Sequence, residues 1–169
     1  METTDPYNHH EYMEDAATKL KAIAHNSNAP RFFKSTGLAS LDELLSRIGS
    51  VRLPALISED GSDQVITDNG SDNPLAKPYY TFYIIYPAKA ADDSTIFTAR
   101  SNALATAKKV ISRMRTHSRD LQYGLKDLDF NTIRIMGVGP IGDNGHGVMV
   151  TFTLWEPADI YYNATDWDN

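Results

Sequence analysis

Residues 132–157 constrain the fold most strongly, because they read as a strand, a glycine-rich turn and a second strand. The segment, TIRIMGVGPIGDNGHGVMVTFTLWEP, holds five glycines around its middle. After the turn, apolar side chains alternate with other residues, which is the period-two pattern of a strand. An Asn-Gly pair inside the turn suits the tip of a tight hairpin. The sequence therefore predicts an antiparallel pair, with strands at 133–138 and 148–154.

A second strong signal is the run YYTFYIIY at residues 79–86. Its residues are aromatic or β-branched on both faces, so we expect a central strand that is buried on both sides. A long helix follows at about 94–116, with an apolar stripe along one side. Phe97, Leu104 and Ile111 recur every seven residues, so we expect them to pack on the sheet. Truncating Leu104 to alanine should then cost on the order of 2–5 kcal/mol.

The remaining segments complete an α+β domain. We expect a helix at 10–26 capped by Asn8, an extended piece at 31–35, a short second helix at 38–48, a strand at 52–58, and an acidic loop at 59–78 with a short strand at 64–67. The predicted fold is a small, mostly antiparallel sheet packed by one long helix, with an N-terminal helix and a short second helix. One domain at 9–157 follows a flexible terminus at 1–8 and precedes a C-terminal arm at 158–169.

The composition excludes several classes of protein. The 169 residues include no cysteine, which rules out disulfides, thiolate metal sites and cysteine nucleophiles. A hydrophobic content of 41% is enough for a folded domain of this length. The acidic N-terminal segment does not read as a targeting peptide, and the apolar runs fall short of the roughly 20 residues that span a bilayer. We therefore expect a soluble protein with no membrane partner.

No segment carries a recognisable catalytic signature. The glycines at 137–147 do not form a phosphate-binding loop, because no lysine follows them and the next element is a strand. His9 and His10 are adjacent, so they point in different directions on a helix and are poor joint metal ligands. His146 would need a nucleophile partner, and no nucleophile motif is present. We expect no enzyme activity, cofactor or metal. The open alternative is a small intracellular enzyme or ligand-binding domain with a site near this hairpin.

The charges are segregated along the chain, whose net charge is −6. Residues 94–119 hold six basic residues and no acidic one, whereas residues 59–72 hold five acidic residues and no basic one. The basic segment is a solvated helix face, a surface for an acidic patch on another subunit, or a nucleic-acid contact, which the net charge disfavours. The candidate interface residues are the basic Arg100, Lys108, Lys109, Arg113 and Arg115, the acidic Glu59, Asp60, Asp63 and Asp68, and Trp155.

Five segments in this order carry a family resemblance. They are residues 53–57 (LPALI), 80–85 (YTFYII), the helix at 94–116, 139–143 (GPIGD) and 147–154 (GVMVTFTL). Their order and texture over roughly residues 11–157 resemble the small α+β proteins that close or join the tails of double-stranded DNA phages, namely tail-terminator, tail-completion and neck proteins. The chain departs from them in the short helix at 38–48, the long acidic loop and the aromatic tail.

The resemblance implies a structural virion protein rather than an enzyme. Members of this family form rings, typically hexameric, that sit on the tail tube and meet the head or neck. It implies a homo-oligomer that is assembled in the host bacterial cytoplasm and contacts other virion proteins. An oligomer of fixed ring size without metal or cofactor would favour this function. A deep pocket that gathers His146 and carboxylates around a ligand would favour the enzyme or binding domain.

Overall fold

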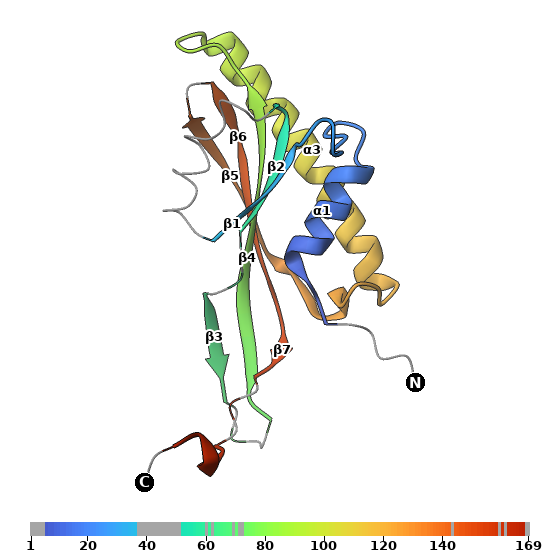
Figure 1. The fold of residues 1–169 in the computed structure, drawn as a ribbon, viewed down its shortest axis with the longest axis vertical. Helices are drawn as coiled ribbons and strands as arrows, with labels where there is room; N and C mark the ends of the chain where they lie inside the picture. The colour runs from blue at the N-terminus through green and yellow to red at the C-terminus, as the bar shows by residue number, and fades with distance from the viewer. Residues whose placement is uncertain are drawn as a thin grey trace.

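The fold is α+β, with helices on one face of a twisted sheet (Figure 1). The computed structural model describes residues 6–36, 52–59, 61, 63–68, 70, 73–142, 144–158, 160 and 162–167. Within these residues the chain forms two α-helices and seven strands. The short helix expected at 38–48 lies outside the described residues.

The elements follow one another in a simple order. They are α1 (His9–Lys19), β1 (Phe32–Ser35), β2 (Ala55–Glu59), β3 (Gln64–Thr67), β4 (Leu75–Pro87), α3 (Asp93–Arg119), β5 (Leu128–Ile141), β6 (Gly145–Leu154) and β7 (Glu156–Pro157). Two short 3-10 helices, η2 (Leu125–Asp127) and η3 (Ala164–Asp166), complete the described chain.

The sheet differs from the small, mostly antiparallel one that the sequence predicts. Its order is β1-β2-β4-β6-β5, and β3 and β7 pair with β4 outside that path. The strands β1 and β2 run parallel, while the other pairs are antiparallel, so the sheet is mixed. The short extended piece at 31–35 was too brief to predict as a paired strand. It becomes β1 because the fold places it beside β2, which is distant in sequence.

The strand β4 organises the sheet, because it has partners along both edges. One edge pairs with β2 at Thr81–Ile85 and with β3 nearer the start of the strand. The other edge pairs with β6 along nearly its whole length and with β7 at its first two residues. The start of β4, together with β3 and β7, forms a three-stranded arm that extends away from the helices (Figure 1).

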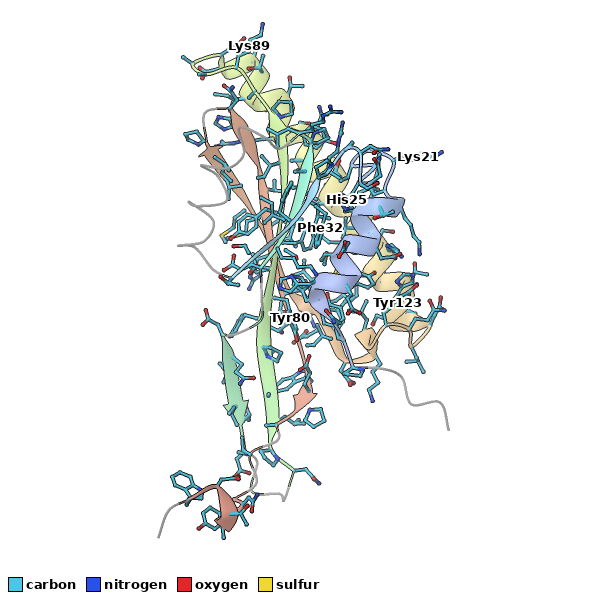
Figure 2. All side chains as sticks on the ribbon, viewed as in Figure 1. Lys21, His25, Phe32, Tyr80, Lys89 and Tyr123 are labelled. Atoms are coloured by element: carbon cyan, nitrogen blue, oxygen red, sulfur yellow. The ribbon has the colours of Figure 1, made fainter. Side chains whose placement is uncertain are left out.

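Both faces of β4 are buried in the body of the protein, as the sequence predicts. Tyr80, Phe82 and Ile84 join the large core under the helices, whereas Tyr83 and Ile85 are buried on the opposite face. The larger cluster adds residues of α1, β6 and α3, which are Tyr12, Met13, Val148, Val150, Phe152, Ala103, Ala107, Val110 and Met114. Figure 2 shows Phe32 between the sheet and α1, and Tyr80 at the junction of body and arm.

The hairpin predicted from the glycine-rich segment is confirmed, with longer strands than expected. The strand β5 pairs with β6 from Leu128 to Ile141, and its register shifts twice. The alternation in β6 sets its faces, because Val148, Val150 and Phe152 all lie in the core under the helices. The predicted short strand at 64–67 is also confirmed, as β3.

The first helix is shorter than the predicted range of 10–26. Its start agrees with the sequence, since the side chain of Asn8 accepts a hydrogen bond from the backbone N–H of Glu11 at 3.2 Å. The helix ends at Lys19 because Leu20 takes an extended conformation. The chain then turns and buries Ile23 completely in the core. The burial of Ile23 in the core, rather than the helical spacing of apolar residues, therefore determines where α1 ends.

The packing face of α3 differs from the predicted one. The buried residues are Ala99, Ala103, Thr106, Ala107, Val110 and Met114. Phe97 and Leu104 are instead 76% and 36% exposed, and Ile111 is only partly buried. The prediction that these three pack on the sheet is therefore wrong for Phe97 and Leu104. The line of small residues lets the helix approach the strands closely, and this turns the larger side chains to the flank.

Two alanine substitutions in α3 should therefore differ in their effect on the free energy of unfolding. Met114→Ala should lower the free energy of unfolding by about 2–5 kcal/mol, because it leaves a cavity in the core. Leu104→Ala should change it by less than about 1 kcal/mol, because the side chain is partly exposed and alanine favours the helix. Urea denaturation followed by circular dichroism measures both values. A large loss for Leu104→Ala would restore the packing predicted from the sequence.

Candidate assembly surfaces

One of the predicted interface residues, Arg113, is used in the contact between α1 and α3 of the same subunit. Arg113 forms an ion pair with Asp15 of α1, and its guanidinium lies 5.5 Å from the centre of the Tyr12 ring. Lys19 approaches the same carboxylate at 2.8 Å. Burial acts to raise the pKa of Asp15, but the hydrogen bonds from Lys19 and Arg113 outweigh it and leave this pKa below its usual range. Arg113 thus joins two helices of one subunit.

The other basic residues of α3 remain on the surface. Arg100, Lys108, Lys109 and Arg115 are exposed, and no ion pair among the described residues uses them. At about 100° per residue, Arg100, Lys108 and Arg115 share the flank of the helix that carries Phe97, Leu104 and Ile111. We call these six residues the α3 flank. It combines exposed apolar side chains with positive charge.

The α3 flank lies on the side of the helix away from α1. Arg113 marks the opposite flank, which contacts α1. The helix itself contacts β4, β6 and, more sparsely, β5. Because β5 is the last strand of the sheet on this side, its exposed Ile135 adds to the apolar surface beside the helix. The α3 flank and the exposed Ile135 therefore lie on the same face of the sheet, toward its β5 edge.

The predicted acidic residues separate into two environments. Glu59 accepts a hydrogen bond from the hydroxyl of Tyr83 at 2.6 Å, on the face of the sheet opposite the helices. Burial raises the pKa of Tyr83, and the bond to Glu59 raises it further. Asp63 and Asp68 are exposed at the two ends of β3. Asp60 lies outside the described residues. The two predicted acidic residues that the described chain exposes therefore flank β3.

The arm exposes many apolar side chains. All four residues of β3 are exposed, with Val65 at 49% and Ile66 at 47%. The other exposed large apolar residues of the arm and its continuation are Leu75, Tyr79, Trp155, Ile160, Tyr162 and Trp167. Exposed apolar side chains gathered in one region mark an interaction site more often than scattered ones do. Sequence reasoning missed this arm, although the Val65-Ile66 pair inside a polar loop was a signal.

Trp155 lies where the arm joins the body. The Lys77 ammonium lies 4.6 Å from the centre of the Trp155 ring and 3.2 Å from a carboxylate oxygen of Asp129. The hydroxyl of Tyr80 donates to Glu156 at 2.9 Å. These contacts connect β4, β5 and β7, so they fix the direction in which the arm leaves the body. One face of the Trp155 ring is thus already in contact with Lys77 of the same subunit.

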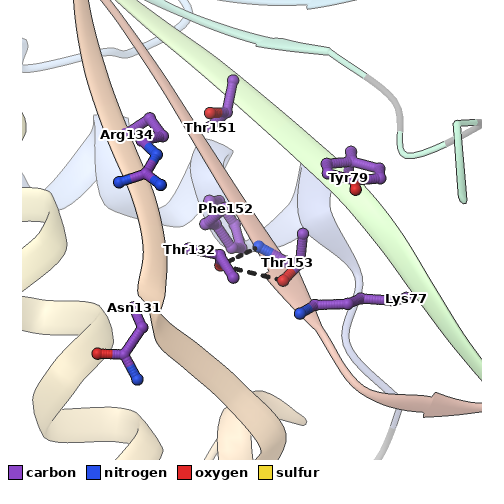
Figure 3. A pocket seen from close by; sticks show the side chains of 8 residues that line it. All are labelled: Lys77, Tyr79, Asn131, Thr132, Arg134, Thr151, Phe152 and Thr153. Carbon is purple, nitrogen blue, oxygen red and sulfur yellow. Dashed lines mark hydrogen bonds between the residues drawn. The ribbon is translucent and has the colours of Figure 1, made fainter. Parts of the chain in front are cut away.

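A shallow open pocket of about 250 Å³ lies on the face of the sheet opposite the helices (Figure 3). It opens where the register of β5 and β6 shifts between Asp129 and Arg134. The hydroxyls of Thr132 and Thr153 lie 3.0 Å apart, and Lys77 is paired with Asp129. Several of its polar groups therefore bond to one another instead of facing the open space.

His146 is buried beneath the glycine-rich hairpin. It pairs with Tyr86 in the sheet register, and its Nδ1 has no hydrogen-bond partner among the described residues. A Cβ added at Gly139 would lie 2.5 Å from this Nδ1, so the ring packs directly on the Gly139 backbone. Burial lowers the pKa of His146, and the charge of Arg100 lowers it further. Burial thus favours the neutral form of the imidazole, whose ring packs against its own hairpin.

No group of three or more histidine, aspartate or glutamate side chains in the described part of the chain could hold a metal ion. No described helix is both long and apolar enough to cross a membrane. Comparison with models of protein families and with curated proteins found no match.

His146 should make folding sensitive to mild acid. Its pKa in the folded protein lies below the ordinary imidazole value of about 6.5, so the unfolded chain binds the proton first. Stability should therefore be complete above about pH 7 and should fall as the pH drops below about 6.5. His117, whose pKa is lowered by burial and by Arg113, should contribute in the same direction.

The substitution His146→Gln isolates this contribution, because glutamine does not titrate. The free energy of unfolding should fall less between about pH 7 and pH 5 for the variant than for the wild type. Urea titrations at a series of pH values measure the difference. His117→Gln serves as the matched comparison. Equal pH dependence in wild type and His146→Gln would show that the His146 pKa is not depressed in the folded protein.

Proposed function

We propose that this protein is a structural virion protein of a tailed phage, and that it forms a ring which terminates the tail or joins it to the head or neck. The order of its elements supports the proposal through the resemblance described above. The observation that carries it is the placement of two exposed apolar surfaces of opposite charge. One is the acidic β3, and the other is the α3 flank with the neighbouring edge of β5.

A ring requires each subunit to use two different surfaces. In a head-to-tail contact, one patch of each subunit meets the other patch of its neighbour, and the ring closes when the rotation allows. Apolar groups supply most of the affinity of such a contact, while complementary charges set partner choice and register. Both components are present on both surfaces here. The proposed ring size is six, as is typical of the family that the chain resembles.

The proposed partners follow from the same surfaces. Copies of this chain contact one another around the ring, and other virion proteins of the tail tube or of the head and neck contact the ring above or below. The proposed location is the virion, after assembly in the host cytoplasm. Sequence-specific nucleic-acid recognition is not part of the proposal, because the basic side chains of α3 lie among apolar ones on an acidic protein.

One observation favours the alternative of a binding domain near the hairpin. The Nδ1 of His146, which has no hydrogen-bond partner within the described part of the chain, is the kind of buried polar group that a ligand satisfies. Its close contact with Gly139 opposes this use, because the backbone occupies the space that a ligand would need. We therefore place the ring-forming role first. Bound small molecules in native mass spectra of the purified protein would reverse this order.

Light scattering coupled to size-exclusion chromatography tests the proposal. The wild type should run as a single oligomer of fixed mass, and negative-stain electron microscopy should show closed rings. Lys108→Glu combined with Arg115→Glu should weaken association by about tenfold or more, and added salt should weaken the wild type in the same direction. Arg113 is left unchanged because it joins α1 to α3 within the subunit.

The matched control reverses two exposed charges elsewhere. Lys21→Glu with Lys126→Glu makes the same change in net charge but lies outside the α3 flank. It should leave the oligomer intact, and both double variants should retain the circular dichroism of the wild type. A wild type that stays monomeric at all concentrations would overturn the proposed ring. Equal assembly of both double variants would show that the flank charges are only solvated.

A further inference from the structure

The outer edge of β5 is open in the part of the chain that the structure describes. Among the described residues, β5 pairs with β6 alone. Ile135 is 36% exposed and Met136 is 48% exposed, and a Cβ added at Gly137 would meet nothing within 4 Å. Residues 135–141 include no charged side chain. Natural proteins usually protect such edges with charges, short strands or covering segments, because an open edge pairs readily with another strand.

The strand β3 lies at the opposite edge of the sheet. It pairs with the start of β4 along the edge that β2 also uses, while β7 and β6 occupy the other edge. The strand β5 lies beyond β6, so the free edges of β3 and β5 face away from each other. One subunit therefore cannot join these two edges to each other. Two subunits placed side by side can.

The two edges are complementary, because both have an apolar centre and the charges around these centres are opposite in sign. The strand β3 carries the exposed pair Val65-Ile66 between Asp63 and Asp68. The strand β5 presents Ile135 on the helix side of the sheet, where the basic side chains of the α3 flank also lie, and it presents Met136 and Arg134 on the other side. Each surface thus offers an apolar centre, and the charges around the two centres are opposite in sign. Such complementarity steers association and disfavours wrong partners.

The two faces of the sheet also match across the junction. Ile66 pairs with Ala76 and lies on the helix side of the sheet, as Ile135 does through its pairing with Val150. Val65 lies on the other side, as Met136 does through its pairing with Met149. If the sheet continues across the junction, Ile66 meets Ile135 below the α3 flank and Val65 meets Met136.

We infer that β3 of one subunit pairs with the outer edge of β5 of the next, so that one β-sheet runs through the ring. The inference rests on the proposed ring and names the surfaces that build it. The new backbone hydrogen bonds satisfy the open edge of β5, and the apolar centres bury each other. Each subunit uses β3 once and β5 once, which is the requirement for a head-to-tail assembly. A symmetric β5–β5 contact would instead leave β3 exposed.

Cysteine crosslinking tests the inference cleanly, because the chain has no cysteine of its own. A disulfide forms only when the two Cβ atoms approach within about 3.5–4.5 Å. Val65→Cys protein is mixed with Arg134→Cys, Met136→Cys or Val138→Cys protein and oxidised mildly. These three positions lie on one face of β5 and sample the pairing register in steps of two residues. One of the three mixtures should give several-fold more covalent dimer than either variant alone.

Two matched controls define the background. Ile135→Cys shifts the thiol by one residue to the other face of β5, and Lys21→Cys places it on an exposed site near the end of α1. Neither should crosslink to Val65→Cys above the level of the single variants. All variants are first checked for the oligomeric mass and circular dichroism of the wild type. If Val65→Cys fails this check, Thr67→Cys replaces it, because Thr67 lies on the same face of β3.

The outcomes separate the inference from the proposed ring. Rings that form without crosslinking at any of the three β5 positions would overturn the strand pairing and leave the ring standing. Crosslinking of Met136→Cys to itself would show a symmetric β5 contact and would overturn the strand pairing. A protein that stays monomeric would overturn both.

Discussion

The structure depends on the burial of both edges of β4. A strand in the middle of a sheet must find hydrogen-bond partners on each side, and β4 finds four. Its second half is apolar on both faces and forms the centre of the body. Its first half extends beyond the body and carries the arm with it. The rigid central strand therefore fixes the position of the acidic, apolar β3 relative to the core.

Local pattern predicted the strands that alternate or that are buried throughout. The hairpin and the central strand follow from side-chain periodicity, because neither helices nor loops commonly show a period of two or a short, continuous aromatic and β-branched run. The size and mixed topology of the sheet did not follow, since β1 joins β2 only through a long-range pairing. The short strand at 64–67 was visible, but its place on the edge of β4 was not. Register between distant segments is a tertiary property.

Periodicity misassigned the long helix for a related reason. The chain offers two lines of apolar residues, one of large side chains at seven-residue spacing and one of alanines with Thr106, Val110 and Met114. Hydrophobicity alone favours the large residues. Close packing on a sheet favours the small ones, because the helix axis comes nearer and buries more of its neighbours. The large residues are left at the flank, where a second molecule can bury them.

The sequence indicated which charged segments make up the candidate interface, but not which of their side chains are paired within the subunit. The segregation of charge along the sequence identified α3 and the acidic segment, and most of those side chains are exposed. Arg113 and Glu59 are the exceptions, because their partners are Asp15 and Tyr83, which are distant in sequence. No local sequence pattern predicts such contacts between distant residues. The apolar parts of both surfaces emerged only when the helix face and the arm were known.

The asymmetry between the two free edges gives the proposed contact its direction. The strand β3 has four residues and an aspartate at each end, and such short, charged edges resist indiscriminate pairing. The strand β5 has a segment without charges at residues 135–141, and this is the edge that we propose accepts a partner. An antiparallel contact between two β3 edges brings Asp63 of one copy close to Asp68 of the other, whereas a symmetric contact between two β5 edges leaves β3 exposed. The proposed unlike pair avoids the repulsion between aspartates and uses both edges, as a head-to-tail contact requires.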